Sequence, residues 1–67
     1  MQFNDWVKEK RKAKKLSFRE AAEAASVCKS YWLYVEKGDI NPTIEKAGAI
    51  TQALGYKLST ALRQCGK

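Results

Sequence analysis

The apolar residues of the first fifteen positions form one narrow stripe with helical spacing. The stripe consists of Phe3, Trp6, Val7 and the aliphatic stem of Lys10. Lysines at positions 8, 12 and 15 lie off the stripe and are expected to face solvent. Asn4 is a suitable N-cap, and Asp5 places a carboxylate in the first turn, where it favours the helix dipole. We therefore predict a first helix over residues 4–15, capped by Asn4.

A second helix is indicated by a capping box. Ser17 is followed three residues later by Glu20, a spacing that lets each side chain bond the other residue's backbone amide. The helix is predicted to run from Phe18 to about Ala25. It carries four small residues with high helix propensity, Ala21, Ala22, Ala24 and Ala25. Their small size allows another helix to approach this backbone closely.

The third helical pattern begins after Ser26 and Val27. Trp32 and Val35 are three residues apart and fall on one face, and other faces carry Lys29, Ser30 and Tyr34. Gly38 is the expected C-cap.

The polar loop KGDINP separates this helix from a fourth, because the residue before Pro42 is disfavoured in helical geometry. Thr43 is the predicted cap, and the helix runs from Ile44 to Leu54, with Gly55 as its stop. Its predicted core-facing stripe is Ile44, Ala47, Ile50, Ala53 and Leu54. A last short helix is expected near Ser59 to Gln64, with an apolar edge at Leu58, Ala61 and Leu62. Five short helices without a strand pattern predict an all-α fold, and residues 1–67 form a single domain.

Composition narrows the possible functions. The 67 residues carry 13 Lys and Arg against 7 Asp and Glu, a net charge of +6 that favours polyanionic partners such as nucleic acid or acidic membrane. A chain of this length needs nearly all its apolar side chains for one core, which disfavours a deep substrate cavity. The sequence has no His and no glycine-rich phosphate loop, so we expect neither an enzyme nor a bound metal or cofactor.

Two further expectations concern location and thiols. No apolar run approaches the ~20 residues that cross a bilayer, so the protein is expected in the cytoplasm and not in a membrane. Cys28 and Cys65 do not make a disulfide framework, and in the cytoplasm both are expected to be reduced.

Residues 17–54, SFREAAEAASVCKSYWLYVEKGDINPTIEKAGAITQAL, resemble the Cro and C1-type helix-turn-helix family of XRE-like DNA-binding regulators. The resemblance covers about residues 3 to 62. It rests on several features occurring together, namely Ser17, Ala22, the turn at Ser26 and Val27, Trp32, Val35, Glu36, Gly38, Asn41 and Pro42. The ten-residue step from Ala22 to Trp32 suits two short helices that touch through a small residue opposite a large one. The resemblance implies a five-helix, lambda-repressor-like domain in which residues 17–38 read DNA.

In that family the second helix of the pair enters the major groove. The resemblance assigns base contacts to Lys29, Ser30 and Tyr34, although Tyr34 could instead pack on the surface. None of the three is the bidentate Gln or Asn that would indicate adenine, so no operator sequence follows. Phosphate contacts are expected at two helix N-termini and beside them, at Ser17, Phe18, Arg19, Lys37, Asn41, Thr43 and Ile44.

Arg11 and Glu36 resemble the family's internal ion pair and are assigned to structure rather than to DNA binding. The aromatic residues Trp6, Trp32 and Phe3 could be base-stacking platforms, but so small a protein needs them in its core. The chain departs from the family pattern at Ser26, where the turn usually has Gly, and at Cys28, where a Ser or Thr cap is common. Cys28 at a helix start could also carry a reactive thiolate.

The predicted function is therefore a sequence-specific regulator of transcription, of the repressor type, bound to double-stranded DNA. One recognition helix reads few bases, so a homodimer on a palindromic operator is expected. Helix five and the Leu58 to Leu62 edge could form the dimer contact. The alternative is the antitoxin of a toxin-antitoxin pair, which binds a partner protein and regulates its own operator.

Overall fold

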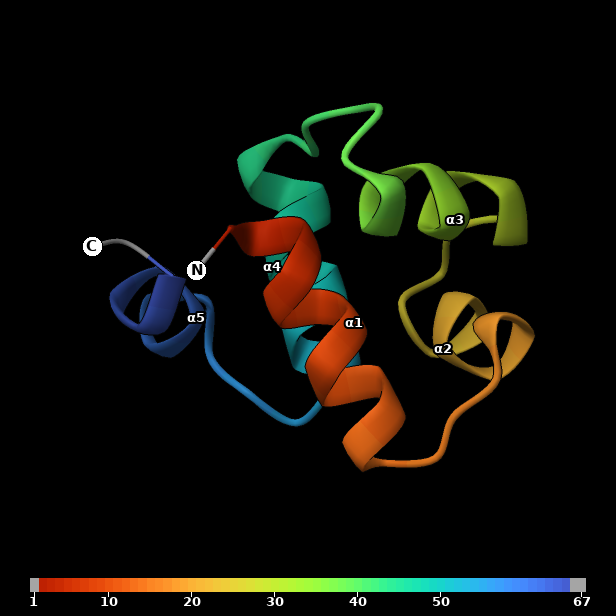
Figure 1. Ribbon diagram of the computed structural model, residues 1–67, viewed down its shortest axis with the longest axis horizontal. Coiled ribbons are helices and arrows are strands. Elements are labelled where there is room, and N and C mark those ends of the chain that lie inside the picture. Colours follow the sequence, from red (N-terminus) through yellow and green to blue (C-terminus); the bar gives the residue numbers. More distant parts are fainter. Residues whose placement is uncertain (1, 66–67) are drawn as a thin grey trace.

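The computed structural model describes residues 2–65, and this part of the chain forms five helices and no strand. The helices are α1 (Phe3–Ala13), α2 (Phe18–Ala24), α3 (Lys29–Lys37), α4 (Ile44–Ala53) and α5 (Leu58–Cys65). Helix α1 crosses the middle of the molecule, with α5 on one side of it and the α2–α3 pair on the other (Figure 1). The predicted all-α fold is confirmed. None of the helices in this region has the length and hydrophobicity needed to cross a membrane.

The helix starts follow the predicted capping chemistry at two of the five sites. The Ser17 hydroxyl accepts from the Glu20 amide at 3.0 Å, and the Glu20 carboxylate accepts from the Ser17 amide at 2.9 Å. Thr43 Oγ1 accepts from the Lys46 amide at 3.2 Å. Each bond satisfies a donor that has no partner within its own helix, so these residues fix where α2 and α4 begin.

The predicted start of the first helix is wrong. Helix α1 begins at Phe3, with Gln2 at the cap position and no side-chain cap bond. Asn4 therefore lies inside the first turn, and its side-chain amide donates instead to the Glu36 carbonyl at 3.4 Å. The helix also ends earlier than predicted, at Ala13, because the chain turns at Lys15, which has a φ of 59°.

The core is built from the larger side chains of α1, α3 and α4 around the small residues of α2. The fully buried large residues are Trp6, Val7, Trp32, Val35, Ile50 and Leu54, and Ala21, Ala22 and Ala25 are buried beside them. Burying both indoles contributes strongly, since each removes roughly 150–250 Å² from water. The prediction that the two tryptophans belong to the core is confirmed.

The predicted apolar stripe of the fourth helix is wrong at its first residue. Ile44 is 71% exposed, whereas Thr51, which was not predicted to be inside, is fully buried. Burial of the Thr51 hydroxyl costs little free energy, because the hydroxyl donates to the Gly48 carbonyl at 3.0 Å. On α5, Ala61 is buried but Leu62 is 51% exposed. Two large aliphatic side chains thus remain on the surface near α4 and α5.

Candidate nucleic-acid interface

Helix α3 has one buried face and one exposed face. Trp32 is 0% exposed and Val35 is also buried, so this face belongs to the core. The exposed surface of the helix presents the three residues predicted to contact bases, Lys29 at its first position and Ser30 and Tyr34 on its outer face, together with Lys37. Tyr34 is 47% exposed, a large exposed fraction for an aromatic side chain. The structure therefore brings the predicted base-contacting residues together on one helix surface.

A tight turn sets α2 against α3. The Val27 amide donates to the Ala22 carbonyl at 2.9 Å, which closes the end of α2. Ser26 has a φ of 60°, the left-handed conformation in which glycine would be unstrained. Cys28 occupies the N-cap position of α3 without a side-chain cap bond. Both departures from the family pattern therefore lie where the sequence placed them, in a turn that leaves α3 prominent at one edge of the molecule (Figure 1).

A buried carboxylate holds α3 in place. Glu36 Oε2 accepts from Arg11 Nε at 2.6 Å, which is the predicted ion pair between α1 and α3. The same oxygen accepts from Trp32 Nε1 at 2.5 Å. Because both bonds are buried, they fix the Glu36 side chain and with it the last turn of α3.

Arg11 extends this network beyond α3. Its Nη1 donates to the Leu16 carbonyl at 2.7 Å, and its guanidinium lies 4.1 Å from the centroid of the Phe18 ring. One arginine therefore links α1, the loop before α2, the first residue of α2 and the end of α3. The bond from Trp32 was not predicted, although the four-residue spacing of Trp32 and Glu36 in the sequence places the two side chains on one helix face.

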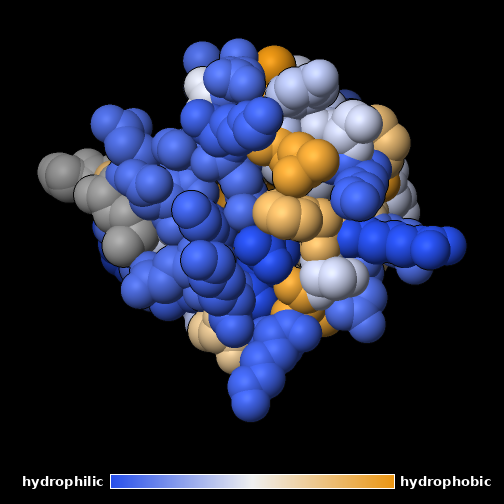
Figure 2. All heavy atoms as spheres, turned by 45° about the vertical axis from the view of Figure 1, so that its right-hand side comes forward, coloured by the Kyte–Doolittle hydropathy of each residue, from blue (hydrophilic) through white to orange (hydrophobic). Residues whose placement is uncertain are grey.

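The predicted phosphate-contacting residues fall into two groups, and the first lies where α1, α2 and α3 meet. Phe18 and Lys37 line one hollow of about 190 Å³, and Lys8 of α1 lines it as well. Ser17 and Arg19 adjoin Phe18 in sequence. Figure 2 brings this side of the molecule forward and shows hydrophilic residues around a small hydrophobic group. Lys8 was predicted only as a solvent-facing residue.

The second group surrounds the start of α4. Asn41, Thr43 and Ile44 line a different hollow, which they share with α5. The amides in the first turn of α4 have no carbonyl partner within the helix, as at every helix start. Of these amides, that of Lys46 donates to Thr43 Oγ1. The first group thus lies beside the C-terminal half of α3, and the second lies at the start of α4, after the loop that follows α3.

The acidic side chains and the thiols are the remaining groups with metal-binding or nucleophilic chemistry. No set of three or more His, Cys, Asp or Glu residues within residues 2–65 is placed to hold a metal ion. Cys28 is exposed and Cys65 is half-buried, and both are free thiols. Burial raises the pKa of the Cys65 thiol, although the positive charge of Lys10 opposes this shift.

Comparison with known proteins identifies the arrangement. Residues 7–60 match the family model described as helix-turn-helix. The structure is similar to the clp gene regulator ClgR from Corynebacterium glutamicum, with a TM-score of 0.86 and 25% identity over 94% of this chain and 67% of that one. The structure is also similar to the restriction-modification controller protein C.AhdI from Aeromonas hydrophila, with a TM-score of 0.84 and 27% identity over 88% of this chain and 89% of that one.

A third similar structure is the biofilm master regulator SinR in complex with DNA, with a TM-score of 0.82 and 32% identity over 91% of this chain and 98% of that one. Comparison with curated proteins gave no match.

Proposed function

Because the chain belongs to the helix-turn-helix family, we propose that it is a sequence-specific regulator of transcription that binds double-stranded DNA through α3. The observation that carries this proposal is the exposed polar face of α3, whose opposite face is locked into the core by Trp32 and Val35. A single α-helix fits the major groove of B-DNA, and a helix held rigidly on one side can present the other to base edges. The similarity to SinR, which was solved with DNA, supports the same mode of binding.

Lys29, Ser30 and Tyr34 are the proposed base-reading residues. Lysine can donate to O6 and N7 of guanine, and serine can donate or accept. Tyrosine offers a hydroxyl for a hydrogen bond to a base edge and an apolar ring for a thymine methyl group. Their exposure leaves all three side chains available to DNA without any rearrangement of the core. The Arg11–Glu36 pair faces inward and is proposed to orient α3 rather than to contact DNA.

Phosphate contacts are proposed at the two hollows described above. The first group is Ser17, Phe18, Arg19 and Lys37, to which we add Lys8 because it lies on the same hollow. The capping box occupies the Ser17 and Glu20 amides, so contacts here would use the amides of Phe18 and Arg19 and the cationic side chains. The second group is Asn41, Thr43 and Ile44, where backbone amides at the start of α4 face outward.

The proposed regulator acts as a homodimer in the cytoplasm, on an operator with two similar half-sites, and has no catalytic role. A dimer is proposed because one α3 helix reads only a few base pairs, and two related half-sites multiply the discrimination. The similar structures are a clp gene regulator, a restriction-modification controller and a biofilm master regulator, which favours a regulator over an antitoxin.

Selection of bound sequences from random duplexes tests this function. We expect one enriched motif, and we expect Lys29→Ala, Ser30→Ala and Tyr34→Phe to reduce the preference for it while the far-UV circular dichroism stays unchanged. Loss of a specific base contact should cost about 1–3 kcal/mol of discrimination. Lys37→Ala should instead weaken binding to all sequences and reduce the salt slope of log K by about 0.9.

Lys57→Ala is the matched control for charge, because Lys57 is exposed in the loop before α5, outside both phosphate-contacting groups. It should leave both the motif and the salt slope close to those of the unmodified protein. The absence of an enriched motif, or wild-type discrimination by all three α3 variants, would refute the proposed function.

A further inference from the structure

Of the three tyrosines in the chain, Tyr34 contributes least to the core. Tyr31 is partly buried against the core, and the Tyr56 ring packs edge-on against the Trp6 ring, with the two centroids 5.3 Å apart. Tyr34 is one of three large hydrophobic residues that remain exposed among residues 2–65, and the other two lie outside α3. Its apolar ring is therefore free to contact a ligand.

The backbone that carries Tyr34 is held firmly. The Tyr34 carbonyl accepts from the amides of Gly38 and Asp39, the latter at 3.0 Å, in the turn that ends α3. The next residue, Val35, is buried, and so is Trp32. A tyrosine side chain has only two rotatable bonds, so placing its ring against a ligand costs little conformational entropy. The Tyr34 ring is therefore presented from a fixed point of α3.

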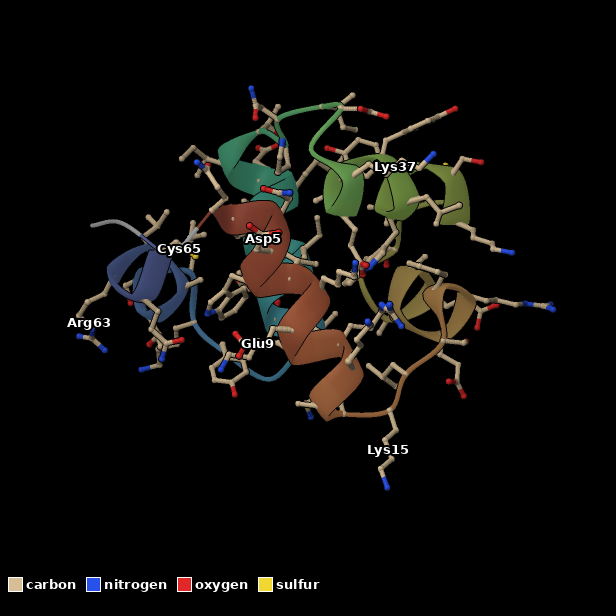
Figure 3. The ribbon with its side chains drawn as sticks, in the orientation of Figure 1. Asp5, Glu9, Lys15, Lys37, Arg63 and Cys65 are labelled. Atoms are coloured by element: carbon tan, nitrogen blue, oxygen red, sulfur yellow. The ribbon has the colours of Figure 1, made fainter. Side chains whose placement is uncertain are left out.

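The residues beside Tyr34 on the surface of α3 are polar. Ser30 lies one turn earlier and Lys37, which is labelled in Figure 3, lies three residues later, and both are exposed. A hydroxyl or an ammonium group finds partners on several base edges and on phosphates. The apolar ring has a single apolar counterpart among the base edges of the major groove, which is the C5 methyl group of thymine.

We propose that Tyr34 makes DNA binding by this protein sensitive to cytosine methylation, because C5-methylcytosine places the same methyl group in the major groove as thymine does. The inference rests on the proposed function, since it requires α3 to lie in that groove. When the base carries the methyl group, the ring and the methyl group remove each other from water. When the base is cytosine or uracil, those contacts are lost and a small gap is left beside the ring.

The expected size of the effect follows from one methyl group. Burial of one such group changes a binding constant by about fourfold. In the proposed homodimer two copies of Tyr34 face two half-sites, so a change at both half-sites multiplies to about fifteenfold. C5-methylcytosine keeps the hydrogen-bonding groups of cytosine, so methylation changes how tightly a given sequence is bound rather than which sequence is preferred by the polar side chains.

Fluorescence anisotropy with matched duplexes tests the proposal. Selection from random duplexes with Tyr34→Ala first locates the base pair at which the preference of the unmodified protein is lost, and this should be a T·A pair. Two comparisons at that position then differ by the methyl group alone, thymine against uracil and C5-methylcytosine against cytosine. In each comparison the duplex with the methyl group should bind about fourfold more tightly per half-site.

Substitutions on α3 separate the ring from the other contacts. Tyr34→Ala should reduce both ratios to about one, whereas Tyr34→Phe should keep them, although it loses the contact made by the hydroxyl. Ser30→Ala is the matched control, because it should weaken all four duplexes and leave both ratios unchanged. Both positions are exposed, so the far-UV circular dichroism of every variant should match that of the unmodified protein.

Two results would overturn the inference and leave the DNA-binding function intact. One is equal affinity for the duplexes with and without the methyl group. The other is a Tyr34→Ala protein that selects the same motif as the unmodified protein or keeps its two ratios. The absence of any enriched motif would overturn the proposed function together with this inference.

Discussion

Replacing Glu36 with alanine removes the acceptor shared by two buried donors. The side chains of Arg11 and Glu36 are only 11% and 5% exposed, so the guanidinium would keep its charge in a site with little water. Breaking a buried pair in this way costs about 3–5 kcal/mol. The Trp32 N–H would also lose its acceptor, and this loss overlaps with the first rather than adding to it in full.

This cost is large for so short a chain. A domain of 67 residues has a free energy of unfolding of about 3–10 kcal/mol. Each kcal/mol corresponds to about 4–8 °C in melting temperature at this size, so Glu36→Ala should lower the melting temperature by at least about 12 °C. Thermal unfolding followed by far-UV circular dichroism measures the effect.

The exposed Arg19–Glu23 pair provides the matched control. Its atoms are 3.5 Å apart, but the side chains are 81% and 69% exposed, and solvent screens an ion pair of this kind. Glu23→Ala should therefore change the melting temperature by no more than a few degrees. The double variant Arg11→Met with Glu36→Leu should be more stable than Glu36→Ala, because neither charge remains buried alone. A melting temperature of Glu36→Ala equal to that of the unmodified protein would refute the reasoning.

Three further predictions concern the turns, the helices and the thiols. Gly38→Ala should lower the free energy of unfolding by about 1 kcal/mol, because the φ of Gly38 is +81°. Gly48→Ala should raise it by about 0.5–1 kcal/mol, because Gly48 lies within a helix and its added Cβ would be 4.0 Å from the nearest side chain. Urea unfolding measures both, and equal effects would contradict this. Ser26→Gly should raise stability by up to about 1 kcal/mol, and a loss would show that Ser26 is unstrained. Cys28 should be alkylated faster than Cys65, because burial raises the pKa of the Cys65 thiol and keeps it neutral; equal rates would contradict this. By the same linkage, the contribution of Cys65 to stability is complete below the pKa of the unfolded thiol and is lost as the pH rises through the folded-state pKa.

Local chemistry explains which parts of the fold could be predicted from sequence. The Ser17 capping box, the Thr43 cap and the Gly38 stop all depend on residues within one helical turn, and each is found in the structure. Asn4 was misplaced because several polar residues near a chain start are compatible with a cap. Its actual partner is the Glu36 carbonyl, which is distant in sequence and comes close to Asn4 only in the folded chain.

The errors at Ile44 and Thr51 have a different origin. An apolar stripe shows which face of a helix avoids water, but it does not show how far the neighbouring helices extend to cover that face. Ile44 lies at the first turn of α4, where no described helix of the same chain covers it. The grouping of the proposed phosphate-contacting residues around two separate hollows depends on the same tertiary arrangement and could not be predicted from the sequence.

The division of α3 into a braced face and an exposed face has a consequence for how such a protein can diversify. Within nine residues, the side chains that hold the helix are buried, those proposed to meet DNA are exposed, and no hydrogen bond joins the two sets. Exchanges at Lys29, Ser30 or Tyr34 therefore leave the buried network of Glu36 unchanged. New operator preferences can arise, or be engineered, one exposed position at a time without a compensating change in the interior.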